Sequence, residues 1–369
     1  MSGPLAGLRV LEFGAIGPVP FAAMLLADMG ADVVQVARPG PRRDPRTDPT
    51  QRGRRVIVLD LKREEDRATA LDLASGAEVL LEGNRPGVME RLGLGPGPCL
   101  ARNPRLVYGR MTGWGQDGPL ARTAGHDINY IALTGALHAI GAAGGPPLPP
   151  LNLVGDYGGG AMFLLFGVLC AAMHARETGR GQVVDAAMVD GASILMSAFF
   201  GMAARGGWGG ARGENLLDGG APWYGTYETA DGGHVAVGAL EEPFWQALLA
   251  ALEIAPDSLP PREDRAGWPA IRAALAGAFR RRGRAEWAAR LEPIDACASA
   301  VLSLHEAADH PHMAARGTHL DLDGLRQPAP APRFSATPGE ARPAREVLGG
   351  AAEVLAGWRT PAPATKEVV

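Results

Sequence analysis

The chain has 369 residues, of which 46% are hydrophobic and 21% are charged, a balance typical of a soluble globular protein. This length predicts two domains, or one domain with a large insertion. The formal net charge of −4 argues against nucleic acid as the main partner. Only three cysteines occur, without metal-ligand spacing, so we expect neither a disulfide framework nor a cysteine metal site.

Targeting signals in the sequence indicate in which cellular compartment the protein is expected. The first ten residues lack the apolar core of a signal peptide, and the last four, Lys366-Glu367-Val368-Val369, are not a peroxisomal Ser-Lys-Leu signal. The most apolar run, residues 161–173, contains Gly167 and is soon followed by charges, so it is predicted to be too short to span a bilayer. We therefore predict a cytoplasmic protein with no membrane partner.

Short β-branched runs alternate with helical patterns along the first 110 residues. This alternation predicts an α/β fold with a parallel, Rossmann-like sheet and right-handed crossovers. Such sheets bind ligands at the carboxyl ends of their strands. The loop Gly14-Ala15-Ile16-Gly17 lacks the three-glycine dinucleotide fingerprint, which disfavours a nicotinamide enzyme. The predicted strands are 8–13, 32–37, 56–61, 79–81 and 106–111, with helices at 21–29 and 64–74.

The pattern changes in the second half of the chain. Residues 116–185 are predicted to be largely helical, and residues 201–220 are dense in glycine. An antiparallel hairpin is predicted around Asp231-Gly232-Gly233, and the tail is helix-like over 341–358. We predict a large α/β domain over 1–190 and 331–360, with a smaller α+β domain over 221–310 inserted into it. Linkers are predicted over 191–220 and 311–330.

Two motifs each place an ionisable side chain ahead of an apolar, helix-length run. They are Gly125-His126-Asp127-Ile128-Asn129-Tyr130, whose helix Thr123 is predicted to cap, and Gly155-Asp156-Tyr157-Gly158-Gly159-Gly160. The positive end of a helix should favour a carboxylate at Asp156 and a neutral imidazole at His126, and it offers donors to an oxyanion. Such a pair suits proton abstraction beside a carbonyl. The alternative is that both residues only cap helices.

Basic residues are concentrated near predicted strand ends. Clustered guanidinium groups there suit a phosphorylated ligand, and Arg85 and Arg91 could join them. The alternative is a solvated basic surface. The nine basic residues are Arg38, Arg42, Arg43, Arg46, Arg52, Arg54, Arg55, Lys62 and Arg63.

Seven stretches of the sequence share the pattern of one known family: residues 25–34, Arg38-Pro39-Gly40, 59–62, 85–93, 113–119, 178–182 and 331–335. Through these stretches the sequence resembles the family III CoA transferases and racemases, the formyl-CoA transferase type. Within that family, Gly125–Tyr130 resembles the α-methylacyl-CoA racemase branch. Two departures occur, Ala37 before Arg38-Pro39 and the absence of a proline before Val301.

The resemblance implies a racemase that interconverts (2R)- and (2S)-2-methylacyl-CoA thioesters through an enolate. His126 and Asp156 would be its acid/base pair, and Glu241 would orient the histidine from the partner subunit of an interlocked homodimer. Acyl-CoA would be the substrate, with no separate cofactor and no metal. The implied substrate- and CoA-binding residues are Arg38, Leu59, Asp60, Leu61, Lys62, Gly83, Asn84, Arg85, Arg91, Gly125, Asp127, Ile128, Asn129 and Tyr130.

Two alternatives stay open. A family III CoA transferase would work through an acyl anhydride at Asp156, but such relatives usually lack the histidine. They also tend to carry a longer glycine-rich loop ending in glutamine, which this sequence lacks. A non-catalytic CoA-binding protein is the other alternative.

Overall fold

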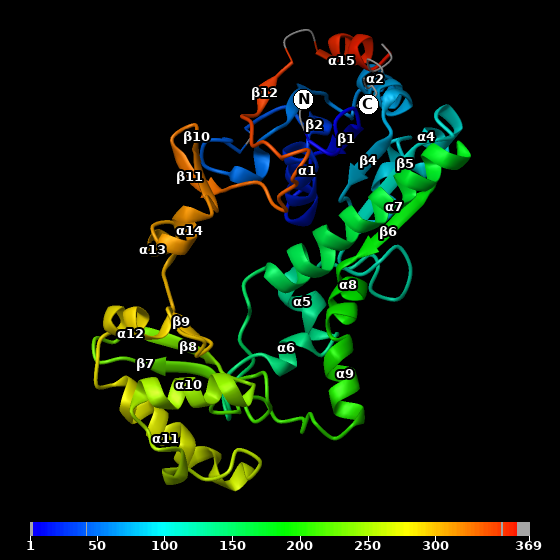
Figure 1. Cartoon of the computed structure of the whole chain (residues 1–369). Helices are drawn as coiled ribbons and strands as arrows, with labels where there is room; N and C mark the ends of the chain where they lie inside the picture. The colour runs from blue at the N-terminus through cyan, green and yellow to red at the C-terminus, as the bar shows by residue number, and fades with distance from the viewer. Residues whose placement is uncertain (1–2, 42, 348–349, 360–369) are drawn as a thin grey trace. The chain divides into compact units, whose positions relative to one another are not determined.

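The structure is a computed structural model that describes residues 3–41, 43–347 and 350–359 (Figure 1). It divides into two compact units, each described here by itself. Unit 1 comprises residues 1–134, 151–195 and 311–369, and unit 2 comprises residues 135–150 and 196–310. Residues 135–150, which the sequence placed in the large domain, thus belong to unit 2, whereas residues 191–195 and 311–330 belong to unit 1.

Unit 1 is built on a seven-stranded sheet in the order β12-β3-β2-β1-β4-β5-β6. Every neighbouring pair is parallel, as predicted for the α/β fold. The last strand in sequence, β12, lies where the tail was predicted to be helical, and β6 lies where helix was predicted. The strands are β1 (Arg9–Phe13), β2 (Asp32–Ala37), β3 (Arg55–Val58), β4 (Val79–Glu82), β5 (Val107–Thr112), β6 (Val183–Ala187) and β12 (Arg345–Glu346).

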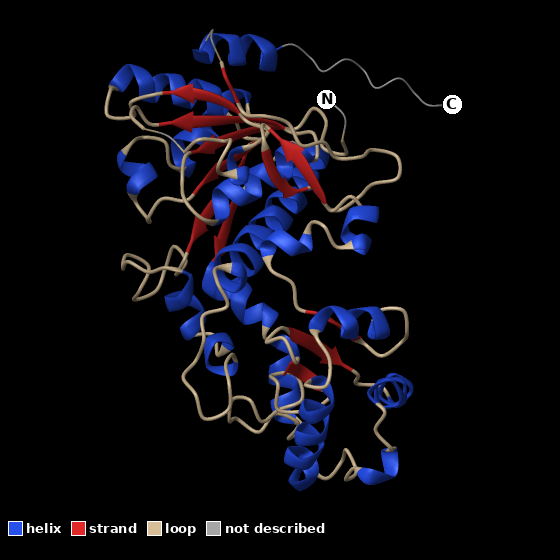
Figure 2. Cartoon of the chain, turned by 90° about the vertical axis from the view of Figure 1, so that its left-hand side faces the viewer, coloured by secondary structure: helices blue, strands red, loops and turns tan. Residues whose placement is uncertain are grey.

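Helices cover both faces of this sheet (Figure 2). Val10 and Val33 belong to one buried cluster, and Leu11 and Val34 belong to another. Alternate strand residues therefore enter different cores, which explains the nearly continuous apolar strands. The helices of unit 1 are α1 (Pro18–Asp28), α2 (Glu64–Gly76), α3 (Val88–Arg91), α4 (Pro96–Arg102), α5 (Asp127–Ala132), α7 (Met162–Thr178), α8 (Met188–Leu195), α14 (Pro311–Ala315) and α15 (Gly350–Arg359), with a 3₁₀ turn η1 (Pro49–Gln51).

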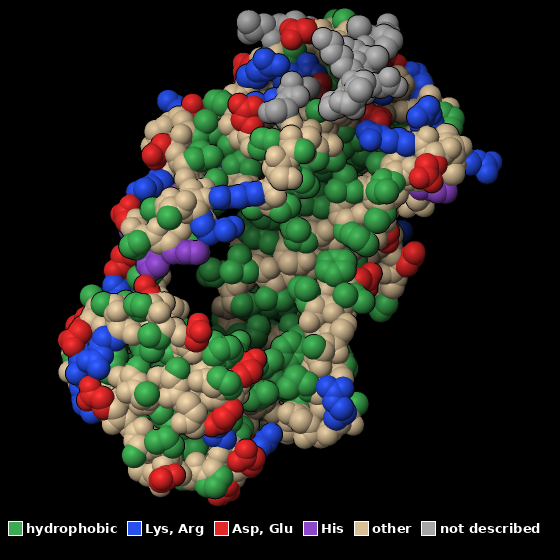
Figure 3. Space-filling view, in the orientation of Figure 1, with side chains coloured by type: hydrophobic (Ala, Val, Ile, Leu, Met, Phe, Trp, Pro, Cys, Tyr) green, Lys and Arg blue, Asp and Glu red, His purple; other side chains and the backbone are tan. Residues whose placement is uncertain are grey.

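One helical stretch is much longer than the sequence predicted. A π-helical segment, η2 (Leu153–Ala161), runs directly into α7, so the helix from Leu153 to Thr178 has 26 residues and a mean hydropathy of 1.7 in its most apolar window. By length and composition it could cross a bilayer, so the prediction that it is too short was wrong. Half of that window is buried inside the protein, as in a core helix. Figure 3 shows hydrophobic side chains gathered over α7 and α8, and Met162 and Phe166 are among those exposed.

Residues 311–330 were predicted to be a linker, but they carry α14 and a hairpin of β10 (His319–Leu322) and β11 (Leu325–Pro328). Arg52 holds this hairpin, donating to the side-chain oxygen of Gln327 at 2.8 Å and to the carbonyl of Pro328 at 2.7 Å. The overlooked signal was Asp323-Gly324, both at positive φ, since Asp-Gly is a strong hairpin turn.

Unit 2 has an antiparallel sheet of β7, β8 and β9. The predicted hairpin is confirmed, because β7 pairs with β8 from Tyr224↔Gly238 to Glu228↔His234. Helix α9 occupies residues that were predicted as linker. The elements of unit 2 are α6 (Ala136–Ala139), α9 (Ser197–Ala204), β7 (Tyr224–Glu228), β8 (His234–Gly238), α10 (Glu242–Leu252), η3 (Pro256–Ser258), η4 (Arg265–Gly267), α11 (Trp268–Phe279), α12 (Arg284–Leu291), β9 (Ala298–Ala300) and α13 (Leu304–Ala307).

Candidate active site

Loops at the carboxyl edge of the unit 1 sheet converge on a cavity of about 540 Å³. They follow β1, β4, β5 and β6, where a parallel sheet is expected to bind a ligand. The two residues singled out from the sequence, His126 and Asp156, both line this cavity. Gly17, Arg85 and Tyr130 line it as well. The cavity thus unites an imidazole and a carboxyl from two separate segments.

His126 stands immediately before α5 with an extended backbone, at φ −130° and ψ 174°. Its backbone N–H donates to the side-chain oxygen of Asn129 at 3.0 Å, so Asn129 supports the helix start rather than lining the cavity. The prediction that Thr123 caps this helix was wrong. The Thr123 hydroxyl instead donates to the Leu120 carbonyl at 2.8 Å, closing an earlier turn.

Asp156 lies in the first turn of the π-helical segment η2. The side-chain amide of Asn152 donates to Oδ2 of Asp156 at 3.1 Å. The backbone N–H of Asp156 donates to Oδ2 of Asp127 at 2.6 Å. Gly17 faces the same carboxyl, because a Cβ at Gly17 would lie only 2.9 Å from Oδ2 of Asp156. Sequence reasoning missed both Asn152 and Gly17, since neither lies near Asp156 in a known chemical motif.

Burial raises the pKa of the Asp156 carboxyl above its ordinary value. The negative charge of Asp127 raises this pKa further, while the Asn152 hydrogen bond and the charge of His126 lower it. The expectation that the helix end favours the carboxylate was therefore wrong in direction, because desolvation outweighs it. A carboxyl with a raised pKa in a cavity is suited to exchange a proton at physiological pH.

Tyr130 supports the segment that carries His126. Burial, followed by the charge of Asp156, raises the pKa of its phenol. The hydroxyl donates to the Gly125 carbonyl, and the ring packs edge-on against Trp114 with centroids 4.8 Å apart. A Cβ at Gly125 would lie 2.7 Å from this ring. Gly125 is thus required for the close approach of backbone and ring.

A larger cavity of about 940 Å³ follows the ends of β1 and β2. Arg38 lines it, and Gly83 and Asn84 line both this cavity and the one containing His126. Arg345 enters it from the C-terminal segment and was not foreseen from the sequence. Leu59 and Leu61 line a small pocket of about 20 Å³ that also includes Arg38 and Asn84.

Other predicted binding residues lie outside these cavities. Asp60, Lys62, Arg91, Ile128 and Asn129 line none of the three. The Lys62 N–H donates to the Asp60 carboxylate at 3.1 Å, which closes the turn after β3. Asp127 is buried at 7% exposure, so its side chain contacts the Asp156 backbone rather than the cavity.

The basic stretch from Arg38 to Arg63 is largely engaged in ion pairs, so the predicted cationic cluster is much smaller than the sequence indicated. Among the described residues, only Arg38 and Lys62 of this stretch have no ion pair, and Arg42 lies outside the described residues. The sequence could not reveal this, because the carboxylates of the buried pairs come from β1, α1 and β2. The pairs are Arg54–Glu12, Arg52–Asp28, Arg55–Asp32, Arg43–Asp48, Arg46–Asp44 and Arg63–Glu65.

Glu241 belongs to unit 2, where it is the exposed residue immediately before α10. The loop that leads to it is held by Arg262, which donates to the carbonyls of Leu240 at 2.6 Å and Ala239 at 3.2 Å. The same guanidinium lies 4.3 Å from the ring centre of Trp223. A partly buried, stacked arginine therefore fixes the backbone ahead of Glu241.

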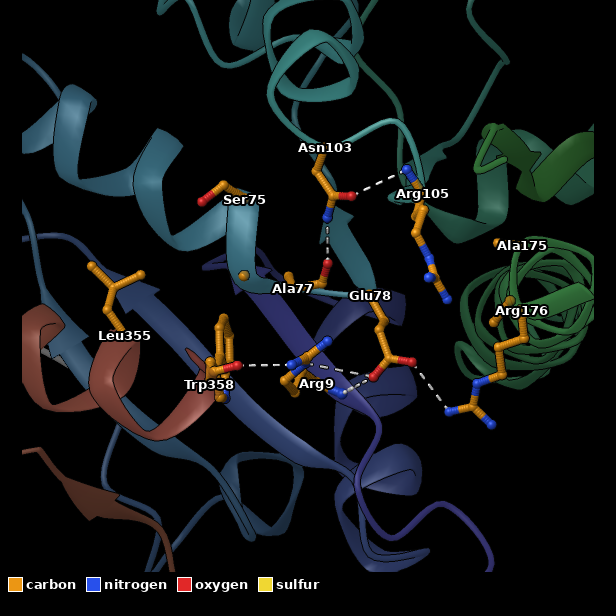
Figure 4. Close-up of a pocket in the computed structure, with 12 residues that line it drawn as sticks. Arg9, Ser75, Ala77, Glu78, Asn103, Arg105, Ala175, Arg176, Leu355 and Trp358 are labelled. Atoms are coloured by element: carbon orange, nitrogen blue, oxygen red, sulfur yellow. Dashed lines mark hydrogen bonds and ion pairs between the residues drawn. The ribbon is translucent and has the colours of Figure 1, made fainter. Parts of the chain in front are cut away.

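A further cavity of about 360 Å³ lies at the amino ends of β1, β4 and β5 (Figure 4). Figure 4 shows Arg9 between Glu78 and Trp358, with the Arg9 guanidinium donating to the Trp358 carbonyl at 2.8 Å. The Trp358 ring N–H donates to Asp32 at 2.7 Å. These contacts tie α15 to the sheet, so this region has a structural role. Across the described ranges, no group of three or more His, Cys, Asp or Glu side chains is placed to hold a metal ion.

Comparison with known proteins identifies the family. Residues 5–350 match the family described as CoA-transferase family III, and the chain therefore belongs to that family. It is 43% identical to alpha-methylacyl-CoA racemase of Mus musculus over 335 residues, which cover 90% of this chain and 87% of the mouse protein. The human alpha-methylacyl-CoA racemase matches with the same identity and coverage. The chain is also 33% identical to acetyl-CoA:oxalate CoA-transferase of Acetobacter aceti, with 88% of each chain covered.

Solved structures agree on the fold. A CAIB/BAIF family protein from Brucella suis superposes with a TM-score of 0.82 over 97% of this chain and all of that chain, at 24% identity. A Mycobacterium tuberculosis protein superposes with a TM-score of 0.78 at 27% identity, covering 96% of this chain and 99% of that one. The mixed α/β architecture with its parallel seven-stranded sheet is that of this family.

Proposed function

We propose that this protein is a racemase that interconverts (2R)- and (2S)-2-methylacyl-CoA thioesters. The observation that carries the proposal is the presence of His126 and Asp156 on one cavity at the carboxyl edge of the sheet. The 43% identity to two proteins named alpha-methylacyl-CoA racemase supports it.

The reaction moves a proton from one face of the α-carbon to the other. One base removes the α-proton, and the electron pair of the broken C–H bond becomes the enolate of the thioester. The conjugate acid of the second base then returns a proton to the opposite face. Two different bases suit this inversion, because a single base tends to return the proton to the face from which it came. Backbone N–H groups at the start of α5, next to Asp127, would stabilise the enolate oxygen. The scheme requires no metal or redox cofactor.

The raised pKa of Asp156 is useful in such a scheme. In one direction Asp156 must accept the α-proton as a carboxylate, and in the other it must donate a proton as an acid. A carboxyl whose pKa is moved towards neutrality performs both tasks better than one at its ordinary value. In this proposal His126 supplies the complementary base and acid on the other side of the α-carbon.

The CoA portion would lie in the 940 Å³ cavity of unit 1, which adjoins the proposed catalytic cavity through Gly83 and Asn84. Arg38 would bind a phosphate there, since it lines this cavity and no described residue pairs with it. Arg38→Ala should raise KM for acyl-CoA while largely sparing kcat, because uniform binding is lost. Arg316→Ala, which removes an exposed arginine outside the three cavities, is the matched control. A fall in kcat with KM unchanged would contradict this placement.

The decisive experiment is exchange in deuterated water. Either epimer of a 2-methylacyl-CoA should acquire deuterium at the α-carbon and yield both epimers. A panel of sterol-like, fatty and short 2-methylacyl chains would identify the acyl group preferred. Absence of exchange with every member of the panel would refute the racemase proposal.

A CoA transferase acting through Asp156 is the competing function, favoured by the 33% identity to the Acetobacter enzyme. His126→Ala separates the two. A racemase should lose about 10²- to 10⁴-fold in rate, as is typical of a general acid/base, whereas acyl transfer through Asp156 should survive. Transfer of CoA to a free carboxylic acid by the unmutated chain would favour the transferase.

We further propose a homodimer in which Glu241 of the partner subunit orients His126. A carboxylate bound to one imidazole nitrogen fixes the tautomer and leaves the other nitrogen free. Refolding a mixture of Glu241→Ala and Asp156→Ala chains tests this arrangement. A shared site restores activity, because one site of the mixed dimer is then built entirely from unmutated residues. If activity is not restored by any mixture, Glu241 does not act across subunits.

A further inference from the structure

We infer that the Asp127 carboxylate is a positioning residue that fixes the backbone of Asp156 and thereby places the Asp156 carboxyl in the cavity. This inference rests on the proposed function, because it concerns the acid/base role of Asp156. Its geometry stands independently, since the Oδ2 atom of Asp127 lies 2.6 Å from the backbone nitrogen of Asp156.

The contact satisfies a backbone group that the helix itself cannot satisfy. In η2 the N–H of Tyr157 donates to the carbonyl of Asn152, five residues earlier, at 3.3 Å. Asp156 lies one residue before this bond, in the first turn, where N–H groups lack helical partners. Asp127 supplies the acceptor from 29 residues away, and a charged acceptor makes a stronger hydrogen bond than a neutral one.

Asp127 is buried and packs closely against Gly155, so the hydrogen bond to Asp156 is the main contact of its carboxylate. The residue is only 7% exposed, and its Oδ1 atom is buried without a hydrogen bond from any described residue. Gly155 makes the approach possible, because a Cβ at this position would lie 2.5 Å from Oδ2 of Asp127. The glycine at 155 and the aspartate at 127 are therefore matched to each other.

The contact also places a like charge beside the proton-transfer group. The ionisable groups that face Asp156 are Asp127, His126 and Tyr130. Of these, Asp127 contributes a negative charge that raises the pKa of Asp156. Asp127 thus acts in two separable ways, by a hydrogen bond that positions Asp156 and by a charge that tunes it.

Two substitutions at Asp127 separate these contributions. Asp127→Ala removes both, and we expect kcat to fall by about 10- to 100-fold, the scale of a displacement near 1 Å at the reacting group, with KM little changed. Asp127→Asn keeps an oxygen that can accept the N–H but removes the charge. It should retain most of kcat while the acid limb of the pH–rate profile moves to lower pH. Asp257→Ala, which removes an exposed carboxylate of unit 2, is the control.

Gly155→Ala disrupts the same contact by adding a Cβ close to Oδ2 of Asp127, and it leaves both carboxyl groups in place. It should lower kcat in the same way as Asp127→Ala. The double variant Asp127→Ala/Gly155→Ala should be no worse than Asp127→Ala alone, because both changes break one contact. If the two losses multiply instead, the substitutions act independently and the inference fails.

The outcomes distinguish this inference from the proposed function. If the unmutated chain shows no α-deuterium exchange, the racemase proposal fails regardless of Asp127. If the unmutated chain exchanges but Asp127→Asn leaves the acid limb unmoved and Gly155→Ala leaves kcat unchanged, Asp127 has no positioning role. These two variants keep the test valid should Asp127→Ala fail to fold, which circular dichroism would reveal.

Discussion

The Nη2 atom of Arg262 donates to the Leu240 carbonyl at 2.6 Å, one residue before Glu241. The same guanidinium stacks at 4.3 Å from the ring centre of Trp223 and 5.3 Å from that of Trp245. A planar cation that packs against two indole rings has little freedom, and the carbonyls that it binds are held in place with it. The exposed Glu241 side chain thus extends from a fixed backbone.

Arg262→Met should therefore reduce kcat if Glu241 acts as proposed, by about tenfold, because a misplaced supporting group misorients the reacting one. Steady-state kinetics and a thermal melt are the measurements. Arg265→Met is the matched control, since Arg265 also stacks on an indole, that of Trp268 at 5.3 Å, but no bond from it to the Ala239 or Leu240 carbonyl is seen. Equal kinetics for the two variants would contradict the role of Arg262.

The acid limb of the pH–rate profile should lie above the ordinary carboxyl pKa of about 3.9. The reason is the raised pKa of Asp156, caused first by burial and then by the charge of Asp127. The sign for stability follows from the same shift. Because the pKa of Asp156 is raised by folding, the folded state binds this proton more tightly than the unfolded state does. The protonated carboxyl therefore stabilises the folded state fully below the unfolded pKa, and this stabilisation is lost as pH rises through the folded pKa. A profile of kcat/KM against pH, which reports the groups of the free enzyme, measures the limb with Asp156→Asn as reference, and a limb at or below the ordinary value would contradict the prediction.

Gly17→Ala should damage the site rather than the fold. The new Cβ would lie 2.9 Å from Oδ2 of Asp156, and the φ of +71° disfavours any side chain. We expect a fall in kcat of about tenfold or more from displacement of the carboxyl. Gly7→Ala is the control, because Gly7 has a similar φ of +87° but a Cβ there would meet no atom within 4 Å. Equal activity in both variants would contradict the claim that the contact with Asp156 makes Gly17 necessary.

Trp358→Ala should destabilise unit 1 by about 3–5 kcal/mol, the usual cost of truncating a buried aromatic side chain. Trp358 is 4% exposed, packs in the core cluster of α2 and β1, and donates to Asp32. Urea unfolding measures the loss. Arg105→Ala serves as the control, since this exposed side chain lines the same cavity and should change stability by less than about 0.5 kcal/mol. Similar unfolding midpoints for both would contradict the anchoring role of Trp358.

The sequence predicted best those elements whose pattern is local. The strand at 32–37 matches β2 over its full length, and the hairpin at 224–238 forms around its Asp-Gly-Gly turn. The two motifs predicted that His126 and Asp156 form a pair, and both residues do line one cavity.

Features that depend on partners far along the chain could not be predicted. The sequence grouped Arg54 with possible phosphate ligands, but its buried partner is Glu12 of strand β1, more than forty residues earlier. The pKa direction of Asp156 was misjudged because burial and the Asp127 carboxylate are properties of tertiary structure. The two-residue strand β12 has no pattern of its own and exists only because β3 offers an edge.

That last pairing has a consequence for how the protein is made. Arg345 pairs with Arg55, so β3 remains an open edge while most of the chain leaves the ribosome. At typical rates of synthesis the delay is on the order of tens of seconds. During this time Arg55 and Val56, the two β3 residues that β12 pairs with, lie on an unpaired edge, the kind of surface on which nascent chains pair wrongly. This edge of the sheet is therefore covered only after residues 345 and 346 have been synthesised, nearly 300 residues after β3.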